Sequence, residues 1–263
     1  ITDLAASDIF VVSTGATLNA TISSNYKATT DAKNDGTANL TLGTGGLTVD
    51  LTSAAGSKGF NLIGSSGTDT ITATGKADTF TIASSGQGNL DVLDGAGGAY
   101  TLQLSAGSHV FASDANFKGI ETVLANTAGS SVNLSAQTEG FTITGGDGID
   151  TIIGGDGVDI ITGGVGDDII TGGAGSDTFN IDAGSDTITD LSASDIFVVS
   201  TGATVNATIS ANYTATTDAE NDGTANLTLG TGGLTVDLTS AAGSTGFNLI
   251  GSSGTDTITA TGK

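Results

Sequence analysis

Short alternating runs of apolar and polar residues recur along the chain and indicate β-strands. Each run has three to five residues, is rich in Leu, Val, Ile, Phe and Thr, and is bordered by Gly, Ser or Asn. Examples are segments 39–42, 47–51, 60–63, 101–104, 120–124, 132–134 and 141–143. No window shows a helical stripe with caps. The pattern predicts an all-β chain, and we expect much of it to form a solenoid.

A long repeat covers both ends of the sequence. Residues 1–76 recur at 188–263, and 70 of the 76 positions are identical, so one full unit spans 1–187. The differences are Ala5/Ser192, Leu18/Val205, Ser24/Ala211, Lys27/Thr214, Lys33/Glu220 and Lys58/Thr245. Such near-identity is typical of stalk, filament or array proteins built from copied units. We therefore expect a longer parent protein with tandem copies.

A shorter repeat, a nonapeptide, lies inside this unit. Residues 145–180 contain four consecutive matches to G-G-x-G-x-D-x-U-x, where U is a large apolar residue. A fifth copy at 181–189 lacks the two leading glycines and keeps Asp186, and a sixth at 190–198 keeps Asp195 and an apolar Phe197. The segment x-U-x suits a short strand whose U side chain points into a narrow core. The segment before it suits a glycine-rich turn.

The nonapeptide spacing also predicts stacks of carboxylates. Two nonapeptides make one coil, so Asp150 should lie over Asp168, and Asp159 over Asp177. Coils of a parallel solenoid stack about 4.8 Å apart, and carboxylates at that spacing repel each other unless a cation lies between them. Calcium accepts six to eight oxygens in irregular geometry, so aspartates together with turn carbonyls suit it.

Composition and charge narrow the function classes. The chain has 42 Gly, 28 acidic residues, six Lys, no Arg and no Cys, and its formal charge is −22. The missing cysteines exclude a disulfide scaffold, a thiolate zinc site and a cysteine nucleophile. The negative charge argues against nucleic acid as a partner, and no apolar run is long enough for membrane insertion. The single His109 is expected to be a strand or turn residue, and we expect no enzyme activity.

Residues 145–189 resemble the RTX, or hemolysin-type, calcium-binding repeats of secreted bacterial proteins. The resemblance implies a right-handed parallel β-roll with calcium held between turns n and n+2. It also implies export to the outside or the surface of the cell by type I secretion. The implied ligands are the carboxylates of Asp150, Asp159, Asp168, Asp177 and Asp186, with carbonyls around Gly146, Gly148, Gly155, Gly157, Gly164, Gly166, Gly173 and Gly175.

Four segments follow from these patterns. Residues 1–63 form a β-rich start of the unit, 64–144 a degenerate β-solenoid, 145–189 the calcium roll, and 188–263 the second copy of 1–76. In the degenerate loops, Asp69 and Asp256 are expected to be turn formers. Their neighbours two nonapeptides along the chain, Gln87 among them, offer no matching carboxylate.

The leading functional hypothesis is a calcium-dependent extracellular structural module of a surface layer, sheath, matrix filament or adhesin stalk. Self-association with identical repeats or chains is expected for such a module. The alternative is an RTX repeat region that assists secretion and folding of a toxin or hydrolase, whose catalytic domain would lie outside this sequence.

Overall fold

The computed structural model of the chain describes residues 1–6, 8–83 and 91–260, and these are almost entirely β-structure and turns. They contain one short 3₁₀-helix, η2 (Asp114–Asn116), and no α-helix. Among the described residues, no helix is long and apolar enough to cross a membrane. Strands pair in parallel with the strand one coil later, which confirms the predicted all-β parallel solenoid.

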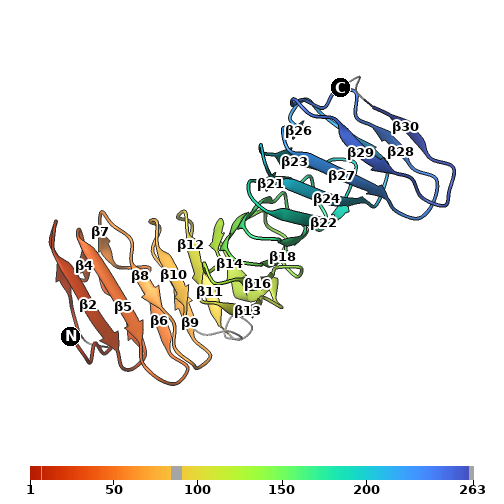
Figure 1. Ribbon diagram of the computed structural model, residues 1–263. Coiled ribbons are helices and arrows are strands. Elements are labelled where there is room, and N and C mark those ends of the chain that lie inside the picture. The colour runs from red at the N-terminus through yellow and green to blue at the C-terminus, as the bar shows by residue number, and fades with distance from the viewer. Residues whose placement is uncertain (7, 84–90, 261–263) are drawn as a thin grey trace. The chain divides into compact units, whose positions relative to one another are not determined.

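The chain divides into two units, and the first comprises residues 1–124. Its strands form three parallel sheets along the solenoid (Figure 1). One contains β2 (Thr17–Ile22), β5 (Thr37–Leu42), β8 (Asn61–Ile63), β10 (Thr79–Ile82), β12 (Thr101–Leu104) and β15 (Thr122–Leu124). Another contains β3 (Tyr26–Lys27), β6 (Thr48–Asp50), β9 (Thr70–Thr72), β11 (Val92–Asp94) and β14 (Phe117–Lys118). The smallest contains β1 (Val11–Val12), β4 (Lys33–Asn34) and β7 (Ala55–Gly56), and β13 (Gly107–Val110) follows β12.

The second unit comprises residues 125–263 and has the same architecture. One sheet contains β17 (Thr142–Asp147), β19 (Ile160–Val165), β21 (Thr178–Ile181), β23 (Ile196–Val199) and β26 (Glu220–Asn221). The next contains β16 (Ser130–Asn133), β18 (Thr151–Ile153), β20 (Ile169–Thr171), β22 (Ser185–Leu191), β24 (Thr204–Ile209), β27 (Thr224–Leu229) and β29 (Phe247–Ile250). The third contains β25 (Tyr213–Thr214), β28 (Thr235–Asp237) and β30 (Thr257–Thr259).

The length of a coil differs between the nonapeptides and the rest of the chain. Thr142 lies opposite Ile160 and Thr151 opposite Ile169, so one coil spans two nonapeptides, as predicted. Elsewhere the coil length varies: Thr17 pairs with Thr37 and Asn39 with Asn61, whereas Asn61 pairs with Thr79 at the nonapeptide spacing. Coils of constant length therefore follow one another in the nonapeptide segment.

The apolar positions of the nonapeptides form the core, as their spacing predicts. Ile152, Ile161, Ile170 and Phe179 are all fully buried. Burial of each side chain contributes about 1.5–3 kcal/mol relative to leaving it exposed. Phe197 continues the row of Ile161 and Phe179, because it lies opposite Phe179 between β21 and β23. The core therefore runs from the nonapeptides into the second copy of the long repeat.

No linker separates the long repeat from its second copy. Residues 187 and 188 both lie in β22, which pairs with β20 on one side and β24 on the other. Figure 1 shows β22, β24, β27 and β29 side by side. The ring of Phe197 then packs against Tyr213 and Phe247, with centroids 6.1 and 6.0 Å apart. The junction is continuous sheet and continuous core.

Candidate metal centre

Buried aspartates from the sixth position of the nonapeptides form two columns. One oxygen of each carboxylate accepts the backbone N–H of the residue one coil earlier. In the first column, the N–H of Asp150 donates to Oδ1 of Asp168 at 2.8 Å, and the N–H of Asp168 donates to Oδ1 of Asp186 at 3.0 Å. In the second, the N–H of Asp159 reaches Asp177 in the same way at 2.9 Å. The carboxylates therefore stack at the predicted spacing of two nonapeptides.

The second oxygen of most of these carboxylates has no protein donor. It is buried and unpartnered in Asp150, Asp168, Asp177 and Asp186. In Asp159 it accepts the N–H of Gly155 at 3.0 Å. An ionised carboxylate can only accept, and an unsatisfied buried acceptor costs about 1–3 kcal/mol or more. The free oxygens thus need a positive partner, and a cation fits that requirement.

A backbone oxygen from the next coil lies close to the free carboxylate oxygen. Oδ2 of Asp150 and the carbonyl oxygen of Gly163 both occupy the space that a Cβ on Gly145 would need. Oδ2 of Asp159 and the carbonyl oxygen of Gly172 do the same at Gly154. The first glycine of a nonapeptide therefore leaves room for two oxygens from different coils to converge.

The sequence pattern did not reveal these first-position glycines as candidate site residues. Only the glycines at positions two and four of each nonapeptide were expected to contribute, through carbonyls near them. A signal was present, because all four exact repeats begin with glycine. The spacing alone does not show that the absent Cβ makes space for a carboxylate of the same repeat.

The glycines at positions two and four of each nonapeptide shape the turns. Backbone φ is positive at Gly146, Gly148, Gly164, Gly166, Gly173 and Gly175, a conformation that side chains disfavour. Gly155 and Gly157 do not adopt it. The carbonyl of Gly155 accepts the N–H of Ala174 at 3.0 Å, and Gly146 lies opposite Gly164 between β17 and β19. The turns that carry these glycines therefore do not all have one shape.

Burial makes the negative form of these carboxylates unfavourable. It raises the pKa of Asp177 and of Asp186 to about 7, and neighbouring aspartates add to the effect. Burial also raises the pKa of Asp150 to about 6, with a contribution from Asp168. The pKa values of Asp159, Asp168 and Asp195 are raised by the same cause. A bound cation would favour the ionised form instead.

The donor chemistry of the columns points to a hard cation. The described residues contain no group of three or more His, Cys, Asp or Glu side chains that could hold a metal by themselves. A metal in either column would therefore be bound by carboxylates together with backbone carbonyls from different coils. Oxygen ligands of this kind suit calcium, which tolerates variable geometry, better than zinc or copper.

The prediction about the neighbours of Asp69 is wrong. The coil there is longer than two nonapeptides, so Asp69 is followed by Asp91, and its N–H donates to Oδ1 of Asp91 at 2.9 Å. Gln87, the neighbour expected from the nonapeptide spacing, lies outside the described residues. Asp69 itself is fully buried and accepts the N–H of Leu47 at 2.9 Å. Stacked aspartates therefore occur outside the exact nonapeptides as well.

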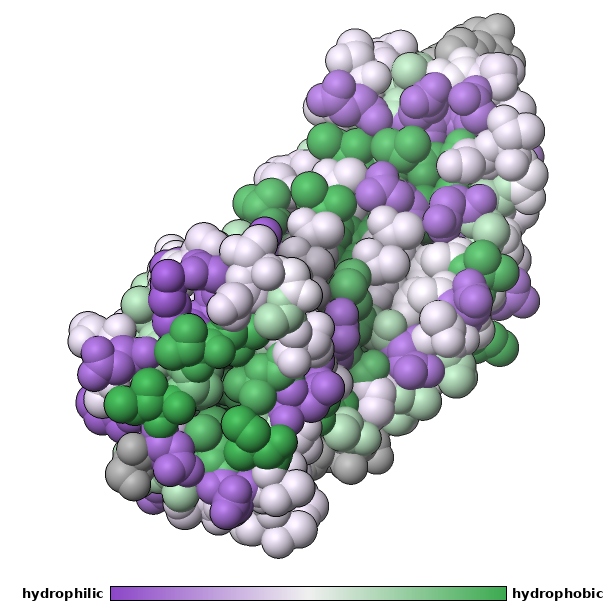
Figure 2. Space-filling model, turned by 90° about the vertical axis from the view of Figure 1, so that its left-hand side faces the viewer, coloured by the Kyte–Doolittle hydropathy of each residue, from purple (hydrophilic) through white to green (hydrophobic). Residues whose placement is uncertain are grey.

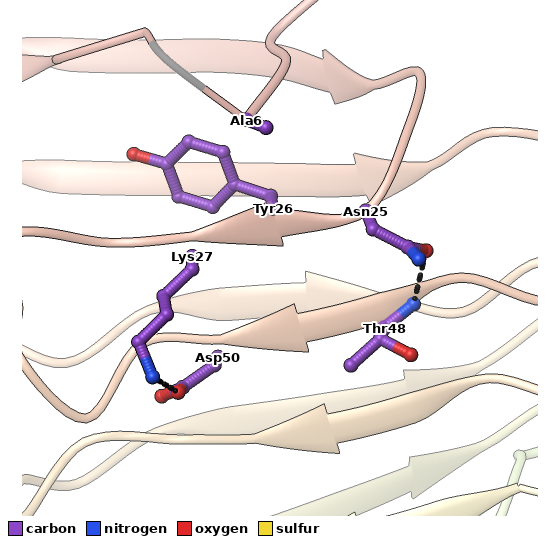
Figure 3. Close-up of a pocket in the computed structure, with 6 residues that line it drawn as sticks. All are labelled: Ala6, Asn25, Tyr26, Lys27, Thr48 and Asp50. Carbon is purple, nitrogen blue, oxygen red and sulfur yellow. Dashed lines mark hydrogen bonds and ion pairs between the residues drawn. The ribbon is translucent and has the colours of Figure 1, made fainter.

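A surface pocket of about 450 Å³ lies in the first unit (Figure 3). Lys27 pairs with Asp50 at 2.6 Å on its rim, and Asn25 accepts the N–H of Thr48 at 2.8 Å. The second copy keeps the amide contact, between Asn212 and Thr235, but has Thr214 where the first has Lys27. The ion pair is therefore particular to the first copy, whereas the amide contact is present in both copies.

His109 lies in β13, as a strand residue, and is fully buried. Its Nε2 lies 2.9 Å from the carbonyl oxygen of Ser105. Burial lowers the pKa of the imidazole, so the ring is neutral at neutral pH.

Comparison with known proteins agrees with this geometry. The sequence profile of the RTX calcium-binding nonapeptide repeat matches in four copies, over residues 63–81, 144–179 and 153–188. No curated protein and no solved structure matches the chain. The matched segments contain the aspartates from Asp150 to Asp186 and also the loops of Asp69 and Asp78. The chain is thus a parallel β-solenoid that carries the RTX calcium-binding nonapeptide repeat.

Proposed function

We propose that this chain is a calcium-dependent structural module of a secreted or surface-exposed tandem-repeat protein. The observation that carries the proposal is the set of free, buried carboxylate oxygens inside a solenoid that continues without a linker into the next copy. Calcium would stiffen the coils, and the repeats would extend the rod.

The proposed calcium ligands follow from the two columns. Each ion would be held by the second carboxylate oxygen of one aspartate, which is free in all of them but Asp159, and by loop carbonyls of a coil two nonapeptides away. The proposed carboxylates are Asp150, Asp159, Asp168, Asp177 and Asp186. The proposed carbonyls are those around Gly146, Gly148, Gly155, Gly157, Gly164, Gly166, Gly173 and Gly175, and the geometry adds Gly163 and Gly172. Calcium would supply positive charge to a chain whose net charge is −22.

The exposed apolar residues of the first copy support stacking between units. Ile9 and Val11 are 57% and 65% exposed, whereas the same positions in the second copy, Ile196 and Val198, are half-buried. The difference arises because β23 lies against β21, with Thr178 opposite Ile196. Figure 2 shows apolar side chains gathered on the face of the first copy that is turned to the viewer. In a tandem array, the last coil of a preceding unit would cover this surface as β21 covers β23.

Calcium-induced folding tests the proposal. Far-UV circular dichroism of the full chain should show more β-structure at millimolar calcium than in chelator, because metal binding contributes directly to the folding free energy. Magnesium at the same concentration serves as the control and should have less effect, since it prefers a small octahedral site and retains its water. An identical spectrum in calcium and chelator would contradict the proposal.

Observation of calcium-dependent assembly distinguishes the structural role from the alternative role in secretion and folding of an attached enzyme. If the repeats build a stalk or layer, electron microscopy of the chain should show extended assemblies with calcium and their loss in chelator. Dispersed single molecules at millimolar calcium would favour a region that assists secretion and folding of an attached toxin or hydrolase.

A further inference from the structure

The degenerate loop around Asp78 satisfies its carboxylate without a metal. Oδ1 of Asp78 accepts the N–H of Phe60 at 2.6 Å, a contact between coils like those in the nonapeptide columns. Its Oδ2, however, accepts both the N–H and the hydroxyl of Thr74, at 2.9 and 2.8 Å. Both carboxylate oxygens are therefore occupied by protein donors.

Two other degenerate loops repeat this arrangement. Oδ2 of Asp69 accepts the N–H and the hydroxyl of Ser65 at 2.8 and 3.0 Å. Oδ2 of Asp256 accepts the N–H and the hydroxyl of Ser252 at 2.7 and 3.2 Å. In each case the hydroxyl residue lies four positions before the aspartate. It therefore occupies the second position of the nonapeptide, and the aspartate occupies the sixth.

The hydroxyl also binds the other side of its loop. Thr74 Oγ1 accepts the N–H of Lys76 at 3.2 Å, and Ser65 and Ser252 accept the N–H groups of Gly67 and Gly254 at the same distance. A hydroxyl has one proton to donate and lone pairs to accept with, so it can join the loop backbone to the carboxylate. It thus occupies the second carboxylate oxygen from within the same loop.

The exact nonapeptides cannot make this contact. Their second position is glycine, at Gly146, Gly155, Gly164 and Gly173. Without a hydroxyl at this position, Oδ2 of Asp150, Asp168 and Asp177 is buried and unpartnered, and Oδ2 of Asp159 accepts only the backbone N–H of Gly155. The hydroxyl therefore supplies a second donor that the exact nonapeptides lack.

One of the six differences between the long copies gives an independent instance. In the second copy the N–H and hydroxyl of Ser192 bind Oδ2 of Asp195 at 2.7 and 3.1 Å. The first copy has Ala5 at this position, where only the backbone N–H reaches Asp8. Asp195 is buried beneath the preceding coil, whereas Asp8 is exposed. The hydroxyl is present in the copy where the carboxylate is buried.

We infer that a Ser or Thr hydroxyl takes the place of calcium in these loops. The carboxylates of Asp69, Asp78, Asp195 and Asp256 bind no calcium, and their coils hold together without it. This differs from the RTX profile, which matches residues 63–81 as well as the exact repeats. The inference rests on the proposed function, because it divides the chain into a calcium-dependent roll and coils that need no metal.

Hydrogen–deuterium exchange of the full chain, read by mass spectrometry with calcium and with chelator, tests the division. Peptides from 60–82 and 247–259 should be equally protected in both conditions. Peptides from 141–189 should gain at least tenfold protection with calcium, because local opening there is coupled to loss of the metal. Calcium-induced protection of 60–82 equal to that of 141–189 would overturn the inference.

Two substitutions, compared by hydrogen–deuterium exchange in chelator without calcium, test the role of the hydroxyl. Thr74→Val keeps the side-chain shape and removes the donor, so exchange in 60–82 should become about tenfold faster, as expected for loss of a hydrogen bond to a buried charge. Ser66→Ala, an exposed serine of a neighbouring loop, is the control and should leave exchange unchanged. Unchanged exchange in Thr74→Val would overturn the inference.

A count of bound calcium gives a second readout. Asp78→Asn should leave the number of bound ions unchanged, whereas Asp168→Asn should lower it. Fewer ions in Asp78→Asn would overturn the inference. A roll that shows no response to calcium would instead overturn the proposed function, and the Thr74→Val comparison in chelator would still decide the role of the hydroxyl.

Discussion

Without calcium, the nonapeptide roll should lose stability as the pH rises. The pKa values of Asp177 and Asp186 are raised from the usual 3.8 to about 7, and that of Asp150 to about 6. A carboxylate whose folded pKa exceeds its unfolded pKa binds its proton more tightly in the folded state. Its contribution to stability is complete at acid pH and disappears as the pH rises through the folded value.

The expected effect is large enough to unfold the roll. Between pH 5 and pH 8 the linkage relation gives a loss of about 3 kcal/mol for each of Asp177 and Asp186, and about 1 kcal/mol for Asp150. The total is comparable to the whole free energy of unfolding of a typical domain, about 5–15 kcal/mol. We therefore expect the roll at neutral pH to depend on a cation that stabilises the charged form.

Urea titrations monitored by circular dichroism would measure this effect on calcium-free protein at pH 5 and pH 8. The midpoint of the roll should be lower at pH 8. Asp177→Asn mimics the protonated acid and retains an oxygen for the N–H of Asp159, so it should raise the midpoint at pH 8 and have little effect at pH 5. Asp156→Asn removes the same charge from an exposed position of the roll and is the control. A midpoint that rises with pH would refute the reasoning.

Three further predictions concern single side chains. Asp168 lies between Asp150 and Asp186 in its column, so Asp168→Asn should shift the midpoint of a calcium titration to higher concentration than Asp150→Asn does; equal midpoints would show that Asp168 does not serve two sites. Phe197→Ala removes a fully buried ring at the junction and should cost about 3–5 kcal/mol of unfolding free energy, while Val198→Ala, half-buried on the outer side of the strand, should cost about 1 kcal/mol in the same urea titration. Lys27→Thr introduces the residue of the second copy and should change the unfolding free energy by less than about 1 kcal/mol, because Lys27 is 73% exposed; a larger loss would show that the ion pair with Asp50 is structural.

Much of the fold followed from periodicity, because a parallel solenoid repeats its contacts as its sequence repeats. The nonapeptides predicted both the coil of two repeats and the buried row that contains Ile161 and Phe179. Where turns differ in length, the sequence has no fixed period, so the pairing of Asp69 with Asp91 could not be found by counting. The length of such a coil depends on the path of each turn, so it can be established only from the three-dimensional structure.

The candidate site was predictable by residue type but not by oxygen atom. The spacing identified Asp168 as a stacked carboxylate, yet it did not show that one oxygen is already bound by the backbone and only the other is free. Likewise, Ser65 and Thr74 read as ordinary loop residues until their hydroxyls are seen on the carboxylates. Hydrogen-bond partners distinguish the aspartates with a free oxygen from those without one, and these partners follow from three-dimensional position.

The unbroken pairing of β20, β22 and β24 has a consequence for how such a protein can change its length. Gain or loss of a whole unit by recombination would leave these strands intact, because the same residues would meet in every copy. An exchange that shifts the register by a fraction of a unit would instead place turns of different length over one another and misalign the inward-facing side chains. A tandem-repeat protein of this kind could therefore change its length in whole units without misaligning its coils.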